Sequence, residues 1–293
     1  ISSKVYNDST FVISGWSIVR DLSNIFFIFI LLAAAFRIMF GSSDVGKTIK
    51  NVIVVALLIN FSLFMVRVVI DTSNVLAHLF YNRISITGVN NTELPPSIEL
   101  KNTGTQREIS TGITAGLNVQ NFLSGKAVEK FLGSNGVKAG TFATIIIFGI
   151  IVNLTAAWIF FKVGFMMLGR IIGLWMSMIL APLAFISKLV PGASTHVKAF
   201  SFEKWSKDLI SYALLAPVFL FFVYLIILFI NSHFLDGFLK NAANYSGFEM
   251  LIVLSLSFIM IIGLLKMAAK TAEDMSGEAG KMISGAATKA FGA

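Results

Sequence analysis

The residues most suggestive of chemistry lie between positions 41 and 48. They read Gly-Ser-Ser-Asp-Val-Gly-Lys-Thr and match the phosphate-binding P-loop pattern at every fixed position. A P-loop works because a buried β-strand delivers the glycine-rich turn to a helix N-terminus, where backbone N–H groups surround the phosphates. Here the preceding residues are apolar and typical of a membrane helix, and the chain contains no predicted α/β unit. We therefore interpret residues 41–48 as a turn between two helices.

Other catalytic chemistry has little support in the sequence. The chain has no cysteine, which excludes a thiolate metal site or a disulfide, and His78, His196 and His233 lie far apart. We predict no catalytic residue, no metal site and no cofactor, and hence a protein that is not an enzyme.

Polar side chains inside apolar blocks are the next candidates, because such residues in a membrane are often functional. Asn60 and Asn153 each lie near the middle of an apolar block. Each either bonds to a neighbouring helix or lines a hydrated path, and we favour helix packing. Arg170 interrupts the third block, together with Lys162. We expect both to extend towards the headgroups, with a shared internal cavity as the alternative.

Glycine and proline positions also suggest helix contacts. Gly169 and Gly173 form a G-x-x-x-G pattern, which permits close approach of another helix. Pro182 and Pro217 lie in similar Leu-Ala-Pro contexts, and each removes one helical hydrogen bond. Paired broken helices are typical of transporters. A transporter is therefore an alternative, although no ionisable residue adjoins either proline.

The elements that must position these residues are membrane helices. The chain is 56% hydrophobic and 13% charged, whereas a soluble domain is about a quarter charged. Its net charge of +8 comes mostly from short segments beside apolar blocks, which indicates membrane orientation rather than nucleic-acid binding. A membrane crossing needs about 20 apolar residues. Blocks of this kind cover residues 22–40, 51–70, 141–189, 209–230 and 248–266.

The number of crossings depends on the block at 141–189. This block is either two crossings joined by a tight turn, or one long tilted crossing followed by a re-entrant or interfacial helix. Lysine and arginine favour the cytoplasmic side. Placing both 41–50 and 188–208 there requires an odd number of crossings between them. We predict an all-α polytopic membrane protein with five transmembrane helices, its N-terminus outside and its C-terminus inside. Six transmembrane helices remain the alternative.

The predicted organisation follows from these blocks. Residues 71–140 have a polar composition with Pro95 and Pro96, and we expect a large extracytoplasmic loop with an amphipathic helix at 116–132. The second helix is expected to continue to Tyr81, and the tail to be a frayed helix or disordered. The parts are an extracytoplasmic segment (1–21), two transmembrane helices (22–70), the loop (71–140), the remaining membrane helices (141–270) and a cytoplasmic tail (271–293).

Several short motifs resemble the TrbL-like family, the polytopic inner-membrane subunits of bacterial type IV secretion and conjugation systems. The resemblance spans about residues 14–270 and includes Trp175. Its motifs are Gly15-Trp16, residues 20–24 (Arg-Asp-Leu-Ser-Asn), 56–62 (Ala-Leu-Leu-Ile-Asn-Phe-Ser), 70–74 (Ile-Asp-Thr-Ser-Asn), 170–175 (Arg-Ile-Ile-Gly-Leu-Trp) and 181–185 (Ala-Pro-Leu-Ala-Phe).

The resemblance implies a non-enzymatic channel or scaffold subunit of the bacterial inner membrane. Such a subunit would aid transfer of DNA or protein substrates, or pilus assembly. Its implied partners are other subunits of the machine, including the ATPases that supply energy, as well as further copies of itself and membrane lipids. A stand-alone transporter or channel for small molecules is the competing hypothesis. A transporter should gather polar groups at the bilayer midplane, and the sequence there is nearly free of charge.

Overall fold

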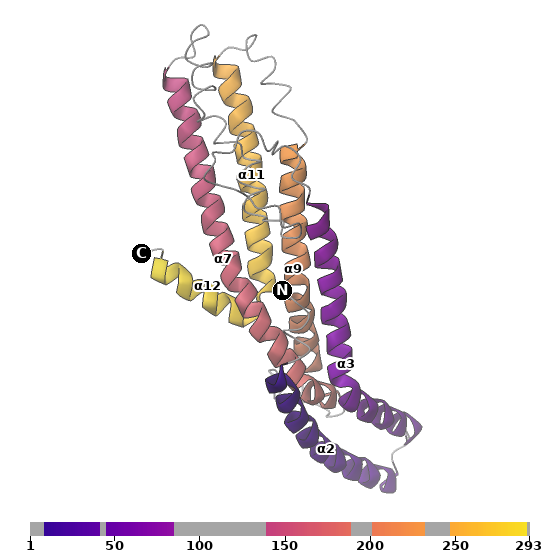
Figure 1. Cartoon of the computed structure of the whole chain (residues 1–293). Helices are drawn as coiled ribbons and strands as arrows, with labels where there is room; N and C mark the ends of the chain where they lie inside the picture. The colour runs from indigo at the N-terminus through magenta and orange to yellow at the C-terminus, as the bar shows by residue number, and fades with distance from the viewer. Residues whose placement is uncertain (1–8, 42–44, 85–138, 189–200, 232–246, 292–293) are drawn as a thin grey trace. The chain divides into compact units, whose positions relative to one another are not determined.

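The computed structural model describes residues 9–41, 45–84, 139–188, 201–231 and 247–291, and every regular element in these ranges is an α-helix (Figure 1). The predicted all-α fold class is therefore confirmed for the described residues. The predicted amphipathic helix at 116–132 lies outside them. The helices are α2 (Thr10–Met39), α3 (Val45–Arg83), α7 (Ala139–Ile186), α9 (Phe202–Asn231), α11 (Gly247–Met275) and α12 (Gly277–Phe291).

Four of these helices are long and apolar enough to cross a membrane, judged by length and composition. They are α2, α3, α7 and α9. The sequence predicted a further crossing at 248–266. Those residues are helical in α11, but α11 is not among the four. A multi-pass membrane protein is thus supported by four candidate spans.

One helix boundary differs from the expected one. The first helix begins at Thr10 rather than at residue 22, because residues in the preceding stretch pack on other helices, with Val12 fully buried in the core. The tail, expected to be either a frayed helix or disordered, forms the helix α12. At the other end of the second span the expectation is confirmed, since α3 continues without a break to Arg83.

The block at 141–189 forms one helix. α7 contains 48 residues, with Pro182 inside it, and no turn divides it. A tight turn between two crossings is therefore absent from this block. At about 1.5 Å per residue, α7 is roughly 70 Å long, more than twice the hydrocarbon thickness of about 30 Å.

The chain divides into two compact units, each made from parts of several helices. The first comprises Ile1–Ala77, Val163–Pro217 and Thr271–Ala293. Its core brings together α2, α3, α7 and α9. The buried members are Val12, Val66, Ile70, Leu174, Met178, Ile179, Ala181, Leu209, Tyr212 and Ala213. A neighbouring cluster joins α3 and α7 around Val55, Ile59, Phe185 and Ile186.

The second unit comprises His78–Lys162 and Val218–Lys270. Aromatic pairs join its helices. Phe80 of α3 meets Phe221 of α9 edge to face, with ring centroids 5.3 Å apart. Phe160 of α7 packs on Phe219 at 6.0 Å, and Phe148 stacks on Phe258 of α11 at 6.3 Å. These contacts are apolar, so in this unit the described helices are held together mainly by packing.

Candidate functional site

Arg170 is the most unusual side chain of the first unit. It lies in α7 and is only 2% exposed, and among the residues that the structure describes it is the largest fully buried one. Its Nε donates to the Tyr212 carbonyl at 2.8 Å, and one terminal nitrogen lies 3.4 Å from the Ala213 carbonyl. The expectation that Arg170 extends to the headgroups is therefore wrong. The guanidinium is held inside the protein, because its fork of donors meets two successive carbonyls of α9.

Pro217 explains why one of these carbonyls, that of Ala213, is free to accept from another helix. In a regular helix the Ala213 carbonyl accepts from the N–H of residue 217, and proline has no N–H to give. A buried carbonyl without a partner costs about 1–3 kcal/mol. Arg170 supplies a replacement donor from α7, and the hydroxyl of Ser73 in α3 also donates to the Ala213 carbonyl. The structure thus brings together Arg170 and Pro217, two residues that the sequence analysis treated separately.

α3 completes this junction through Ser73 and Asn74. Ser73 is 4% exposed. The Oδ1 of Asn74 accepts from Arg170 at 3.2 Å, and its buried Nδ2 has no hydrogen-bond partner among the described residues. We refer to Ser73, Asn74, Arg170, Ala213 and Pro217 as the arginine junction. It links three helices through one buried cation.

Tyr212 lies beside the junction, with glycines around its ring. A Cβ placed on Gly173 of α7 would lie 2.8 Å from three carbons of the ring. A Cβ on Gly277 would overlap the ring and its hydroxyl, and Gly277 also has a positive φ of 62° that favours glycine. Gly173 therefore allows close packing inside this chain, against a side chain of α9. Gly169 is likewise buried in α7.

Two tryptophans contact other helices near the second proline, Pro182. Trp205 of α9 donates its indole N–H to the carbonyl of Ser177, which precedes Pro182 in α7, at 3.0 Å. Trp175 packs on Phe11 of α2 with ring centroids 6.3 Å apart, while its own buried N–H has no hydrogen-bond partner among the described residues. Both indoles therefore act in contacts between helices.

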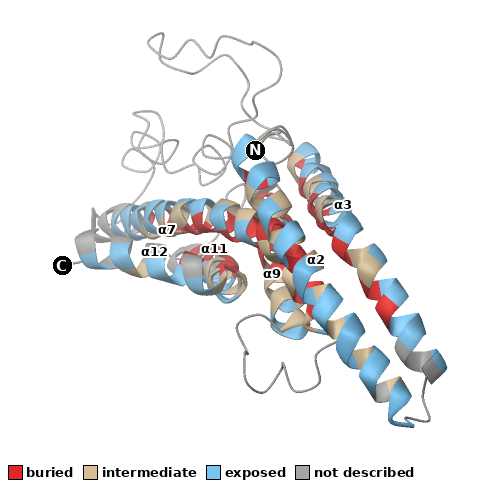
Figure 2. Cartoon of the chain, turned by 90° about the horizontal axis from the view of Figure 1, so that it is seen from below, coloured by how far each residue is buried: buried red, intermediate tan, exposed pale blue. Residues whose placement is uncertain are grey.

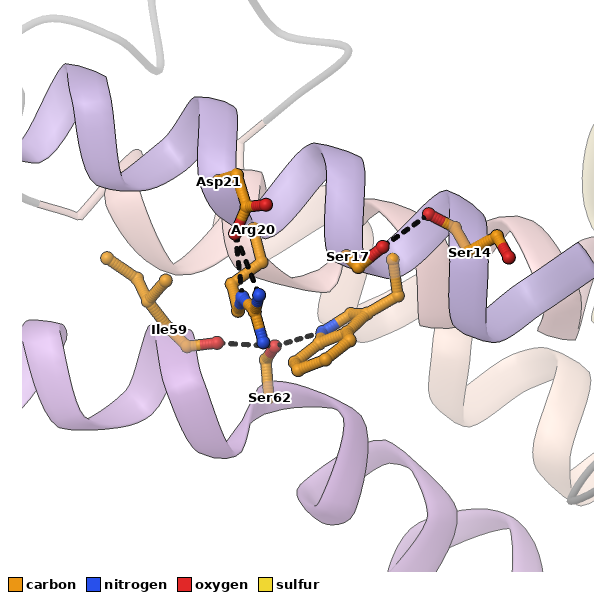
Figure 3. Close-up of polar contacts among 7 residues, drawn as sticks. Ser14, Ser17, Arg20, Asp21, Ile59 and Ser62 are labelled. Carbon is orange, nitrogen blue, oxygen red and sulfur yellow. Dashed lines mark hydrogen bonds and ion pairs between the residues drawn. The ribbon is translucent and has the colours of Figure 1, made fainter. Parts of the chain in front are cut away.

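A further polar contact joins α2 to α3 (Figure 3). Trp16 donates its indole N–H to the Ser62 hydroxyl at 2.9 Å, and Ser62 in turn donates to the Ile59 carbonyl at 2.7 Å. The Arg20 guanidinium lies 4.8 Å from the centre of the Trp16 ring and pairs with Asp21 at 2.8 Å. Close packing nearby depends on Gly15, where a Cβ would lie 3.1 Å from Ile179.

The two asparagines behave differently from Arg170. Asn60 is exposed and donates to the Ala56 carbonyl at 3.0 Å, and Asn153 donates to the Gly149 carbonyl at 3.0 Å. Both bonds stay within the asparagine's own helix. The structure brings neither of them to the arginine junction.

The P-loop match also lies apart from the arginine junction. α2 ends at Met39, and Gly41 adopts a φ of 85° before α3 begins at Val45. The segment before the glycine is therefore a helix, where a phosphate-binding loop requires a strand. Within the described ranges, no group of three or more metal-ligating side chains is present.

Sequence reasoning missed Ser73, Tyr212 and Trp205. One signal was available, because Pro217 identifies Ala213 as the residue whose carbonyl loses its donor. The identity of the replacement donors was not readable, since α3 and α7 are distant in sequence. Comparison with protein-family models, with curated proteins and with solved structures finds no match for this chain.

Proposed function

We propose that this protein is a non-enzymatic scaffold or channel subunit of a type IV secretion or conjugation machine in a bacterial inner membrane. In this role it aids transfer of DNA or protein, or the assembly of a pilus. Its partners are other subunits of the machine, including ATPases, and further copies of itself. The proposal includes five transmembrane helices, with the N-terminus outside and the C-terminus in the cytoplasm.

The main support for the proposal is that polar side chains inside the helices form hydrogen bonds between helices. Trp16, Ser73 and Arg170 each donate a hydrogen bond to another helix of the same chain. These residues also belong to the motifs that resemble the TrbL-like family. A family resemblance located in helix-to-helix contacts supports a shared architecture, which is what a scaffold subunit requires.

The surface of α2 gives a second line of support. Only 6% of the most apolar stretch of α2 is buried, compared with 44% for α9. Figure 2 shows exposed residues along most of α2. Large apolar side chains such as Phe29, Leu32 and Phe36 are half exposed or more. Lipid or a neighbouring subunit must cover them, since such a surface is unfavourable in water.

A stand-alone transporter is the competing function. Transporters hold their substrate among polar groups near the bilayer midplane, often where a helix is broken. Pro217 lies inside α9, which continues as one helix, and Ser73 and Arg170 satisfy the carbonyl that Pro217 frees. This arrangement favours a structural role for the proline.

The test is to delete the gene from its host and to measure conjugative DNA transfer and protein secretion. We expect transfer to fall to background and to return when the wild-type chain is supplied on a plasmid. A matched control is a plasmid that expresses the Gly164→Ala chain, because Gly164 has open space around it. Undiminished transfer in the deletion strain would rule the proposal out. Solute movement by the purified chain alone in liposomes would establish the transporter instead.

A further inference from the structure

At the arginine junction, donors from other helices replace a hydrogen bond that α9 lacks, and this suggests a mechanical role for α9. Pro217 leaves the Ala213 carbonyl without its usual helical donor, and a proline ring also pushes against the preceding turn. Such a helix has a weak point, because one rung of its hydrogen-bond ladder is absent. Beyond this turn Phe219 and Phe221 pack on α7 and α3, so the part of α9 that needs a further support is the turn itself.

What holds the turn comes from outside α9. Ser73 of α3 and Arg170 of α7 both donate to the Ala213 carbonyl, and Arg170 also donates to Tyr212 one residue earlier. Both donors are at least 96% buried, so water does not compete for them. Each donor is therefore positioned to fix the turn of α9 that Pro217 weakens.

We propose that Pro217 is a hinge in α9 and that Arg170 and Ser73 form the clamp that sets its angle. With the clamp closed, the turn of α9 before Pro217 keeps a donor for its free carbonyl. When the clamp is lost, this turn becomes more flexible, although Phe219 and Phe221 still pack on α7 and α3. The proposal is independent of the function proposed above, because it concerns the shape of α9 and not what the protein transfers.

Pro182 provides a comparison within the same chain. It frees the carbonyl of Met178, whereas the nearby indole of Trp205 donates to the carbonyl of Ser177. Arg170 instead bonds to Tyr212 and Ala213 of α9 and to Asn74 of α3. Removing Pro182 should consequently leave the effect of Arg170 on α9 unchanged.

The experiment measures distances along α9 in the purified full-length chain in nanodiscs. Nitroxide labels are attached to cysteines placed at Ile210 and Leu228, which are both exposed and lie on either side of Pro217. Labelling is specific because the chain contains no cysteine. Pulsed electron paramagnetic resonance then gives the distribution of distances between the labels. We expect one narrow distribution for the otherwise unchanged chain.

The variants separate a clamp from ordinary packing. Arg170→Met should broaden the distribution, and Ser73→Ala should broaden it less while preserving the fold. In a Pro217→Ala chain the helix regains the missing N–H, so Arg170→Met should leave the distribution narrow. Ser62→Ala is the matched control, because Ser62 is also a buried serine of α3 but contacts α2, and it should not broaden the distribution.

Two results would overturn the proposal. One is an unchanged distribution in both the Arg170→Met and Ser73→Ala chains. The other is equal broadening by Arg170→Met whether residue 217 is proline or alanine, since the arginine would then act without reference to the hinge. If Arg170→Met does not fold, the same comparison is made with Ser73→Ala in the proline and alanine backgrounds.

Discussion

At the scale of single residues, Tyr212 is a closely packed side chain of the first unit. Its ring lies against Gly173 on α7 and Gly277 at the start of α12, and its carbonyl accepts from Arg170. An aromatic ring held between two glycines has little freedom to move when either glycine gains a side chain. Packing of this kind makes small changes costly.

The first prediction concerns Gly173. Gly173→Ala should destabilise the protein by about 1–3 kcal/mol, because the added methyl overlaps the Tyr212 ring and forces it to shift. Thermal unfolding in detergent, followed by tryptophan fluorescence, measures the loss. In a Tyr212→Leu background the same substitution should cost much less.

Gly164→Ala is the control for this measurement. Gly164 lies in the same helix, but no atom would lie within 4 Å of its added Cβ. Alanine is a better helix former than glycine, so stability should stay level or rise by up to about 1 kcal/mol. Equal losses at the two glycines would show that the contact with Tyr212 is unimportant.

At the scale of elements, the segment between α2 and α3 decides whether the P-loop match has any meaning. We predict that the protein shows no saturable ATP binding and that Lys47→Ala changes nothing. The reason is the helix that ends at Met39 where a strand is needed. Isothermal titration of the detergent-purified chain tests this. Saturable binding that Lys47→Ala abolishes would mean that residues 41–48 bind nucleotide after all.

The length of α7 leads to another prediction at this scale. A helix of 48 residues exceeds one membrane crossing. Single cysteines are placed at exposed positions along it, at Ile147, Leu154, Phe161, Leu168 and Met176. We expect a protected stretch of about 20–25 residues, with labelling by a membrane-impermeant maleimide beyond it.

Each cysteine variant is also labelled after denaturation, which shows that the thiol is reactive. Protection at all five positions in the native protein would contradict a single crossing with an extension beyond the membrane. It would require a tilt or a thickness outside the usual range for a bilayer.

At the scale of the whole molecule, orientation is the main expectation still to be tested. We predict that cysteines at positions 43 and 103 are labelled from opposite sides of the membrane, with Ser43→Cys labelled from the cytoplasm. The basis is the pair Lys47 and Lys50 in the short segment, since long loops translocate largely regardless of charge. Labelling in intact spheroplasts and in inverted vesicles tests both sides. Reaction of both thiols from one side would refute the five-helix topology.

Assembly is the second expectation at this scale. We predict that the purified chain is an oligomer or requires partner subunits, because α2 carries apolar side chains that its own chain leaves exposed. Mass photometry in nanodiscs gives the number of copies. We expect Phe29→Cys chains to form cross-links between copies through α2. Asn60→Cys chains serve as the comparison, because Asn60 is an exposed residue on a different helix, α3. A monomer that forms no cross-links through α2 would contradict this prediction and would mean that lipid alone covers the surface of α2.

The sequence by itself determined the class of the protein and the course of its helices. Apolar blocks of about 20 residues require helices, because lipid offers no partner for backbone N–H and C=O groups. The helical block at 141–189 and the helix continuing through Tyr81 followed from composition alone. The start of the first helix at Thr10 did not, because residues 10–21 mix polar and apolar side chains and are fixed by Val12 and Trp16 contacts to other helices.

Only the tertiary structure decided what the polar residues inside those helices do. The sequence predicted helix packing for Asn60 and Asn153 and a headgroup position for Arg170, yet the asparagines bond within their own helices and Arg170 joins three helices. The physical reason is distance along the chain. A buried cation needs several acceptors at once, and those for Arg170 come from Asn74, Tyr212 and Ala213, which become neighbours only when α3, α7 and α9 pack together.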